Sequence, residues 1–123
     1  PNWEEKVREF TGGQGADHVI EVGGAGTFAK SLRATRQGGH VALIGILTGI
    51  AGNVPTLMMM AKQIKLQGII VGSRRHQQEM IRALDANPGL RPVIDRTFPL
   101  EKLADAFRHE ESATHFGKIC VEM

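Results

Sequence analysis

Three short apolar segments, each followed at once by glycine, recur along this chain at a nearly constant interval. They start near residues 17, 41 and 66, about 24 residues apart, and segments with helical spacing of apolar residues separate them. Strand, helix and strand alternating at this interval predict an α/β fold whose strands lie parallel in one sheet. Because the apolar runs are nearly continuous, we expect these strands to be buried on both faces. The predicted strands and the glycines that end them are residues 17–22 with Gly23, 40–44 with Gly45, and 66–71 with Gly72.

The rest of the 123-residue chain, which is long enough for one domain, predicts three more helices and two extended segments. Asn2 and Glu5 have the spacing of a capping box ahead of an apolar stripe that ends at Phe10. Helical stripes at residues 77–84 and 100–107 flank an extended segment at 91–98. Residues 118–123 alternate between apolar and polar, which predicts a half-buried strand that is antiparallel to its neighbour or lies at a sheet edge.

Composition excludes several classes of protein. Cys120 is the single cysteine, which rules out an intrachain disulfide and a cysteine-rich zinc site and favours a reducing, cytoplasmic compartment. The five histidines are scattered without metal-ligand spacing, so we expect no metal site in this chain. Fifteen basic residues against thirteen acidic ones, with few aromatic residues, predict no nucleic-acid partner. No apolar run approaches the roughly 18 residues of a membrane span, so we expect no membrane insertion.

The glycines at the strand ends predict a ligand site. In an open parallel sheet, ligands bind outside the carboxyl ends of the strands. Glycine there lets the backbone approach a ligand closely and leaves amide and carbonyl groups free to bond it. Three glycine-ended strands in one sheet therefore predict a flat ligand lying across these ends.

Two known glycine patterns fit this chain only in part. Residues 24–29, Gly-x-Gly-x-x-Ala, follow a strand and open a helix as a dinucleotide fingerprint does, but the next strand lacks the acid that would bind a ribose. Residues 21–26 are similar to a methyltransferase glycine loop, and the acid that such a loop needs after the next strand is also missing. A stand-alone α/β module that uses these strand ends for another ligand, or for assembly, remains an alternative, and an S-adenosylmethionine-dependent methyltransferase is a second one.

Six motifs in a fixed order resemble one protein family. This is the C-terminal part of the zinc-type medium-chain alcohol dehydrogenase and quinone reductase family, and the resemblance covers almost the whole chain. The motifs are GADHVIEVG at residues 15–23, GGHVALIG at 38–45, GIIVGSR at 68–74, PVID at 92–95, LADAF at 103–107 and FGKI at 116–119.

The resemblance implies a fold and a division of the chain. The fold is half of a doubly wound, Rossmann-like parallel sheet with three βα units, followed by a C-terminal helix and an edge strand. Residues 1–90 would be the C-terminal half of the dinucleotide-binding domain, and residues 91–123 would belong to the catalytic domain of longer relatives. The chain would then be a fragment, inactive alone, because the pyrophosphate loop, the first βαβ half and any zinc ligands would lie upstream.

The resemblance also implies the function and the contact residues. The longer protein would bind NAD or NADP, with zinc in some relatives, and transfer hydride between nicotinamide and a small alcohol, aldehyde, ketone or quinone. In this chain the resemblance implies no catalytic residue and no metal ligand. The cofactor contacts that it implies are Gly23, Gly24, Gly45, Ile46, Leu47, Val71, Gly72, Ser73 and Lys118.

The sheet edges predict self-association. In the Rossmann strand order, the strand at 17–22 pairs with a first strand that this chain lacks, so its outer backbone groups are unpaired. In dimers of the family, the strand at 66–71 joins its symmetry mate. We therefore expect a homo-oligomer formed through sheet edges, with the 66–71 strands meeting antiparallel.

Overall fold

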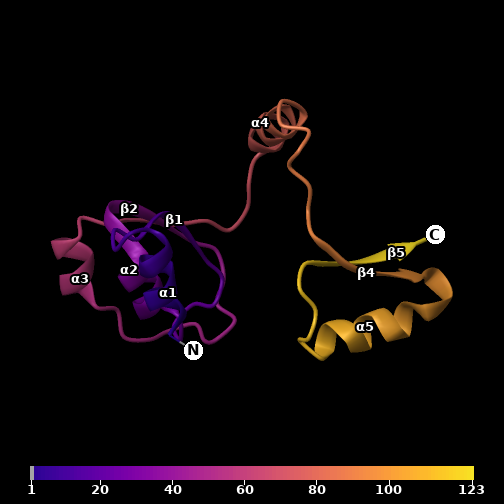
Figure 1. The fold of residues 1–123 in the computed structure, drawn as a ribbon, viewed down its shortest axis with the longest axis horizontal. Coiled ribbons are helices and arrows are strands. Elements are labelled where there is room, and N and C mark those ends of the chain that lie inside the picture. Colours follow the sequence, from indigo (N-terminus) through magenta and orange to yellow (C-terminus); the bar gives the residue numbers. More distant parts are fainter. Residues whose placement is uncertain (1) are drawn as a thin grey trace. The chain divides into compact units, whose positions relative to one another are not determined.

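The computed structural model describes residues 2–123 of the chain. The chain folds as two compact units, the first ending at Gly72 and the second spanning Ser73–Met123 (Figure 1). The elements of the first unit are α1 (Trp3–Phe10), β1 (Ala16–Glu21), α2 (Phe28–Ala34), β2 (Thr35–Leu43), α3 (Thr56–Ala61) and β3 (Lys65–Gly68). Those of the second are α4 (Arg74–Asp85), β4 (Ile94–Pro99), the 3-10 helix η1 (Leu100–Lys102), α5 (Leu103–Glu111) and β5 (Lys118–Glu122).

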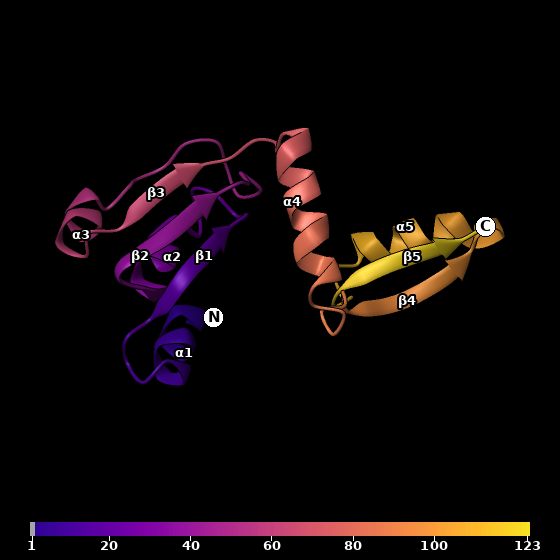
Figure 2. The same ribbon diagram turned by 90° about the horizontal axis from the view of Figure 1, so that it is seen from above.

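The first unit contains the predicted parallel sheet. Its strands lie in the order β1-β2-β3, all parallel, so that Val19 lies beside Val41 and Val41 beside Leu66 (Figure 2). This confirms the α/β fold class. The predicted bounds differ for all three strands: β1 is shifted by one residue, β2 begins at Thr35, directly after α2, and β3 ends at Gly68 rather than at residue 71.

The core of this unit lies between one face of the sheet and the helices that connect its strands. Phe28 and Leu32 of α2 pack with Val41 of β2 and with Ile64, and Val19, Met58 and Met59 close the cluster. The apolar stripe of α2 and the methionines of α3 therefore meet on the same face. Successive parallel strands joined by crossovers of one hand place their helices in this way.

The opposite face of the sheet is covered only in part in the described chain: Ala42 of β2 is 5% exposed there, but the expectation of burial on both faces is wrong for β1. Successive side chains of a strand point to opposite faces, so Ile20 of β1 points away from the core that its neighbour Val19 contacts. The Ile20 side chain is 62% exposed. His18 and His40 are paired in register on β1 and β2, and their ring centroids lie 5.7 Å apart. The near-continuous apolar pattern indicated a strand that requires cover, but it did not indicate that both connecting helices lie on one face.

Two charged side chains join the helices of the first unit, the buried Glu4 and the half-buried Lys62. The Glu4 carboxylate of α1 is 6% exposed and lies 3.7 Å from Lys30 Nζ and 3.6 Å from Arg33 Nε, both on α2. Lys62, which follows α3, donates from Nζ to the carbonyls of Leu32 and Arg33 at 2.8 and 2.9 Å, and to that of Thr35. A cation at the carbonyl end of a helix satisfies acceptors that have no partner within the helix.

Of the two alternatives expected for the C-terminal strand, the edge position is confirmed and the antiparallel direction is wrong. β5 pairs parallel with β4 in a two-stranded sheet, because α5 carries the chain back along the sheet between them. Asp95 of β4 holds this unit together: its Oδ2 lies 2.7 Å from His109 Nε2, and its Oδ1 accepts from Phe116 N at 2.9 Å. These bonds, first the one from His109, hold the pKa of Asp95 below its usual value.

The capping box also lies elsewhere than predicted. Asn2 precedes α1 without a side-chain capping bond. At α4, by contrast, Ser73 Oγ accepts from His76 N and Ser73 N donates to His76 Nδ1, both at 3.3 Å. A histidine thus takes the place in which the motif usually has glutamate or glutamine.

The two compact units divide at Gly72. The predicted domain boundary after residue 90 concerns longer relatives and stays a prediction.

The ends of β1 and β2 approach so closely that Gly45 has no room for a side chain. A Cβ there would lie 2.1 Å from the carbonyl oxygen of Val22. We expect Gly45→Ala to lower the free energy of unfolding by about 3 kcal/mol, because backbone atoms cannot yield as flexible side chains do. Urea unfolding measures this, with Gly89→Ala as the control, since nothing lies within 4 Å of a Cβ at Gly89. Equal effects of the two substitutions would contradict the close approach.

Candidate functional site

Two loops meet at the carboxyl ends of β1 and β2. The first loop, residues 22–27, joins β1 to α2, and the second loop, residues 44–55, joins β2 to α3. Backbone bonds continue the parallel pairing beyond the strands: Ile44 N and Gly45 N donate to Glu21 O at 2.9 and 3.1 Å, and Thr48 N donates to Gly23 O at 2.7 Å. The two loops therefore form one continuous surface at this edge of the sheet.

The first loop is organised around the carboxylate of Glu21, which is only 2% exposed. Its Oε1 accepts from Gly23 N at 2.7 Å, Gly24 N at 2.8 Å and Thr27 Oγ1 at 2.6 Å, and its Oε2 accepts from Ser31 Oγ. Burial acts to raise the pKa of Glu21, but the bonds from Ser31, Thr27, Gly24 and Gly23 outweigh it and hold the pKa below its usual value. The carboxylate is thus charged at neutral pH, and its contacts are with the protein itself.

The second loop is fastened to the first by the side chain of Thr48. Its Oγ1 accepts from Gly26 N at 2.7 Å and donates to Gly23 O at 2.8 Å. One hydroxyl thus uses both its donor and an acceptor position across the gap between the loops. Serine and threonine are the two small residues that can do this.

Gly24 makes a second close approach between the loops. Its φ of +86° lies in the left-handed region that favours glycine, and a Cβ there would lie 2.8 Å from Ile46 Cα and 3.0 Å from Gly49 O. A side chain at this position would separate the loops. The glycine therefore serves contact between backbone segments.

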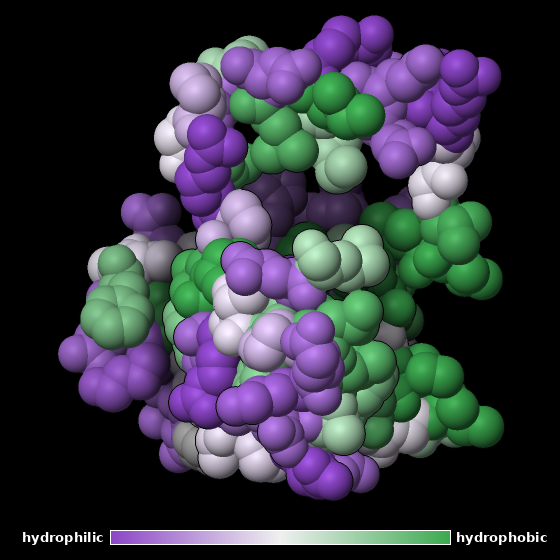
Figure 3. Space-filling model, turned by 90° about the vertical axis from the view of Figure 1, so that its right-hand side faces the viewer, coloured by the Kyte–Doolittle hydropathy of each residue, from purple (hydrophilic) through white to green (hydrophobic). Residues whose placement is uncertain are grey.

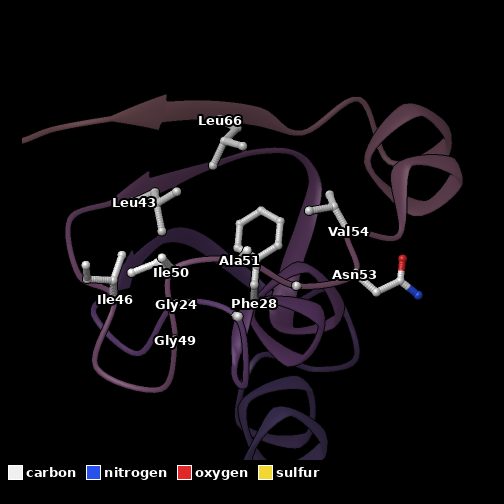
Figure 4. A pocket seen from close by; sticks show the side chains of 12 residues that line it. Gly24, Phe28, Leu43, Ile46, Gly49, Ile50, Ala51, Asn53, Val54 and Leu66 are labelled. Atoms are coloured by element: carbon white, nitrogen blue, oxygen red, sulfur yellow. The ribbon is translucent and has the colours of Figure 1, made fainter.

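A small apolar pocket opens beside these loops, with a volume of about 160 Å³ (Figure 4). Phe28, Leu43 and Leu66 point into it from α2 and the sheet, and Ile46, Ile50 and Val54 line it from the second loop. Ligand pockets for drug-sized molecules are about 300–1,000 Å³, so this one has room for a single ring and not for a whole dinucleotide.

The structure brings five of the nine predicted contact residues together. Gly23 and Gly24 lie in the first loop, and Gly45, Ile46 and Leu47 begin the second. Ile46 and Leu47 are 59% and 84% exposed, so they present apolar surface at the carboxyl edge of the sheet. This is the arrangement expected for contacts along one side of a flat ligand.

The other four predicted residues lie apart from that group along the chain. Val71 and Gly72 follow β3, and the Val71 side chain is 82% exposed. Ser73 begins the second unit, where both its backbone amide and its hydroxyl are engaged at the start of α4. Lys118 is exposed at the start of β5, where its amide donates to Val93 O at 2.8 Å.

Glu21 and Thr48 are the residues that sequence reasoning missed. An acid at the end of an otherwise apolar strand, followed by hydroxyl residues at 27 and 31, was the available signal for Glu21, because positions four apart lie on one side of a helix. No comparable signal marked Thr48, whose contacts are 22 and 25 residues away in the chain.

The lowered pKa of Glu21 makes a contribution to stability that depends on pH. The contribution is complete above the pKa of the unfolded chain, about 4.3, and is lost as the pH falls through the lower folded value. Glu21→Gln keeps an acceptor for the glycine amides but removes the charge. We expect it to cost about 1 kcal/mol at pH 7 and to flatten the loss of stability below pH 5.

Urea unfolding between pH 3 and pH 7 (roughly the range over which carboxyl groups titrate) tests this expectation. The exposed Glu101→Gln serves as the matched control, because it makes the same chemical change on η1. If the free energy of unfolding falls as steeply below pH 5 in Glu21→Gln as it does in Glu101→Gln, the charge of Glu21 does not stabilise the loop.

Two searches of the described residues bear on other functions. No group of three or more His, Cys, Asp or Glu side chains in residues 2–123 is placed to hold a metal ion. Within the same range, every helix is too short or too polar to cross a bilayer.

Comparison with known sequences finds the same family throughout. A family described as zinc-binding dehydrogenase matches residues 2–121. A zinc-type alcohol dehydrogenase-like protein of Schizosaccharomyces pombe is 31% identical over the whole chain, and a quinone oxidoreductase-like protein of Rattus norvegicus is 25% identical over 98% of it. The chain spans only 36% and 37% of the lengths of these relatives.

Solved structures agree with this assignment. An NAD-dependent alcohol dehydrogenase is 32% identical over the whole chain, with a TM-score of 0.77, and the chain covers 36% of it. A 2-octenoyl-CoA carboxylase reductase, solved with NADP and 2-octenoyl-CoA, is 26% identical over 97% of the chain, with a TM-score of 0.78 and 26% of its length covered. Because the family pattern extends over nearly the whole chain and the fold agrees with it, this protein belongs to the zinc-binding dehydrogenase family.

Proposed function

We propose that this chain supplies the nicotinamide side of the cofactor site in an NAD(P)-dependent oxidoreductase. The observation that supports it is the junction of the two loops at the carboxyl edge of a parallel sheet, the edge at which such sheets bind ligands. The neighbours whose titles name NAD or NADP share this fold. The cofactor, when bound, accepts or gives the hydride in exchange with an alcohol, aldehyde, ketone or quinone.

The residues of this chain would bind and orient the cofactor. Gly23, Gly24 and Gly45 would let the ring and its ribose approach the backbone, and Ile46 and Leu47 would cover apolar surface and exclude water. We extend the proposal to Val71, Gly72, Ser73 and Lys118 as outer contacts, and to residues 91–123 as part of the catalytic domain of the longer enzyme. No step is assigned to zinc, because residues 2–123 contain no cluster that fits it.

The geometry favours neither alternative function. A methyltransferase would need an acid facing its ligand, whereas the Glu21 carboxylate is taken up by the first loop itself. A stand-alone module would need a pocket for a whole ligand, and the pocket at this edge has room for one ring. We place the protein in the cytoplasm on the strength of its single cysteine.

We expect this chain to bind NADH or NADPH weakly, with a dissociation constant of order 1 mM, and to turn over no alcohol. That constant corresponds to about −4 kcal/mol, which is reasonable for half of a dinucleotide site without a pyrophosphate-binding helix. NMR titration of the ¹⁵N-labelled chain should shift amides at residues 23–26 and 45–49. AMP, the matched control without nicotinamide, should leave them unshifted, and equal shifts with AMP would contradict the proposal.

The outer edges of the three-stranded sheet and the exposed apolar side chains lead to a proposal about assembly. β1 and β3 each pair only with β2 among the described strands, so both outer edges offer unpaired backbone groups. Apolar side chains are also exposed, Ile20 and Ile70 in the first unit and Phe107 and Phe116 in the second; Figure 3 shows apolar residues, in green, at the surface. Edges and apolar surface of this kind favour association.

We therefore expect the chain to form dimers or larger assemblies, with the β3 edges meeting antiparallel. Light scattering at micromolar concentration should give a mass at least twice that of one chain, and dilution should lower it. A monomer with well-dispersed amide resonances at the same concentration would show that the edges are protected in another way.

A further inference from the structure

The first loop owes its conformation to two side chains. Glu21 accepts from Gly23 N and Gly24 N, and Thr48 accepts from Gly26 N and donates to Gly23 O. Three amides and one carbonyl of a six-residue loop are therefore bonded by these two side chains. Both side chains reach the loop from outside it, Glu21 from the end of β1 and Thr48 from the second loop.

We propose that Thr48 and Glu21 are positioning residues of the nicotinamide site, which hold the two loops as one pre-formed unit and so set its affinity for the cofactor. The inference rests on the proposed function for the identity of the ligand. It goes beyond that function because it assigns a role to two residues outside the predicted contacts. The role is exerted through the loop backbone.

The geometry separates this role from direct contact with a ligand. Glu21 is 2% exposed, and its carboxylate oxygens accept from groups of the first loop and α2, so a ligand at the edge cannot reach it. The hydroxyl proton of Thr48 is already donated to Gly23 O, so it is not free for a ligand acceptor. What a ligand would meet is the glycine backbone whose conformation these bonds fix.

Pre-organisation of this kind changes affinity because a loop that is already ordered loses less conformational entropy when it binds. Fixing the backbone of one residue costs about 1–2 kcal/mol in conformational entropy. Bonds that already hold the loop in the free protein remove part of this cost from the binding step. Loss of the Thr48 hydroxyl should leave the loops free to separate at Gly26. We expect this to weaken NADH binding about tenfold without unfolding the protein, since Thr48 is exposed.

Three variants and one control test the proposal on this chain. Thr48→Val keeps the shape but removes the hydroxyl, Thr48→Ser restores the hydroxyl, and Glu21→Gln keeps an acceptor for the loop amides. Thr114→Val is the matched control, because it removes a threonine hydroxyl from a turn in the second unit, where it bonds Ser112 at 2.8 Å. Each protein is examined by amide hydrogen exchange at residues 23–26, by NADH titration and by urea unfolding.

We expect Thr48→Val to speed exchange at Gly26 about tenfold and to weaken NADH binding about tenfold, with the unfolding midpoint nearly unchanged. Thr48→Ser should recover both properties. Glu21→Gln replaces a charged acceptor with a weaker neutral one, so it should speed exchange at Gly23 and Gly24 and weaken NADH binding by a smaller factor than Thr48→Val does. Thr114→Val should change neither exchange at Gly26 nor binding.

Three outcomes would overturn the inference. Unchanged exchange at Gly26 in Thr48→Val would show that the hydroxyl does not hold the loop. Faster exchange with unchanged affinity would show that loop order does not set binding. Losses of affinity that follow the unfolding midpoint in every variant, Thr114→Val included, would show a merely structural role. Failure of the proposed function is distinguishable, because the unaltered chain would then bind no NADH while its exchange data still report on the loop.

Discussion

A buried carboxylate is the interaction on which the ligand edge of this protein depends. Glu21 ends β1, and four donors surround it, two from the backbone of the first loop and two from hydroxyl side chains of the loop and α2. Removing water from a carboxylate is costly unless hydrogen bonds replace the lost ones, and here they do. The same bonds set the direction in which the chain leaves the strand and enters α2. Sheet, loop and helix are therefore joined at one side chain.

This arrangement explains why the strand-end glycines are adjacent rather than alternating. Consecutive amides at Gly23 and Gly24 converge on one oxygen atom, and the positive φ of Gly24 brings the chain against the second loop. A dinucleotide fingerprint instead directs its amides toward a pyrophosphate at a helix N-terminus. The first loop uses its amides internally, which agrees with a site that approaches a ligand through close backbone packing and apolar contact.

The sequence predicted the parallel sheet well because its signals are local. Apolar runs, glycine stops and the helical stripe of α2 depend on neighbours within a few residues, and all three strands lie where they were expected, with different ends. What could not be predicted depended on distant partners. The parallel pairing of β4 with β5 is set by the crossover through α5, and alternation in residues 118–123 predicts a strand without indicating the direction of its neighbour. The Asp95 to His109 bond and the Thr48 bridge likewise join residues far apart in sequence.

The division of the chain at Gly72 has a consequence for cooperativity. Among residues 2–123, eight apolar residues are buried; six belong to the first unit, and Phe98 and Ala106 belong to the second. Because burial of apolar area is the main source of folding free energy, the two units have unequal stabilities. The chain should therefore lose its order in two steps, the second unit first, and a substitution in either unit should change the midpoint of that unit's own step.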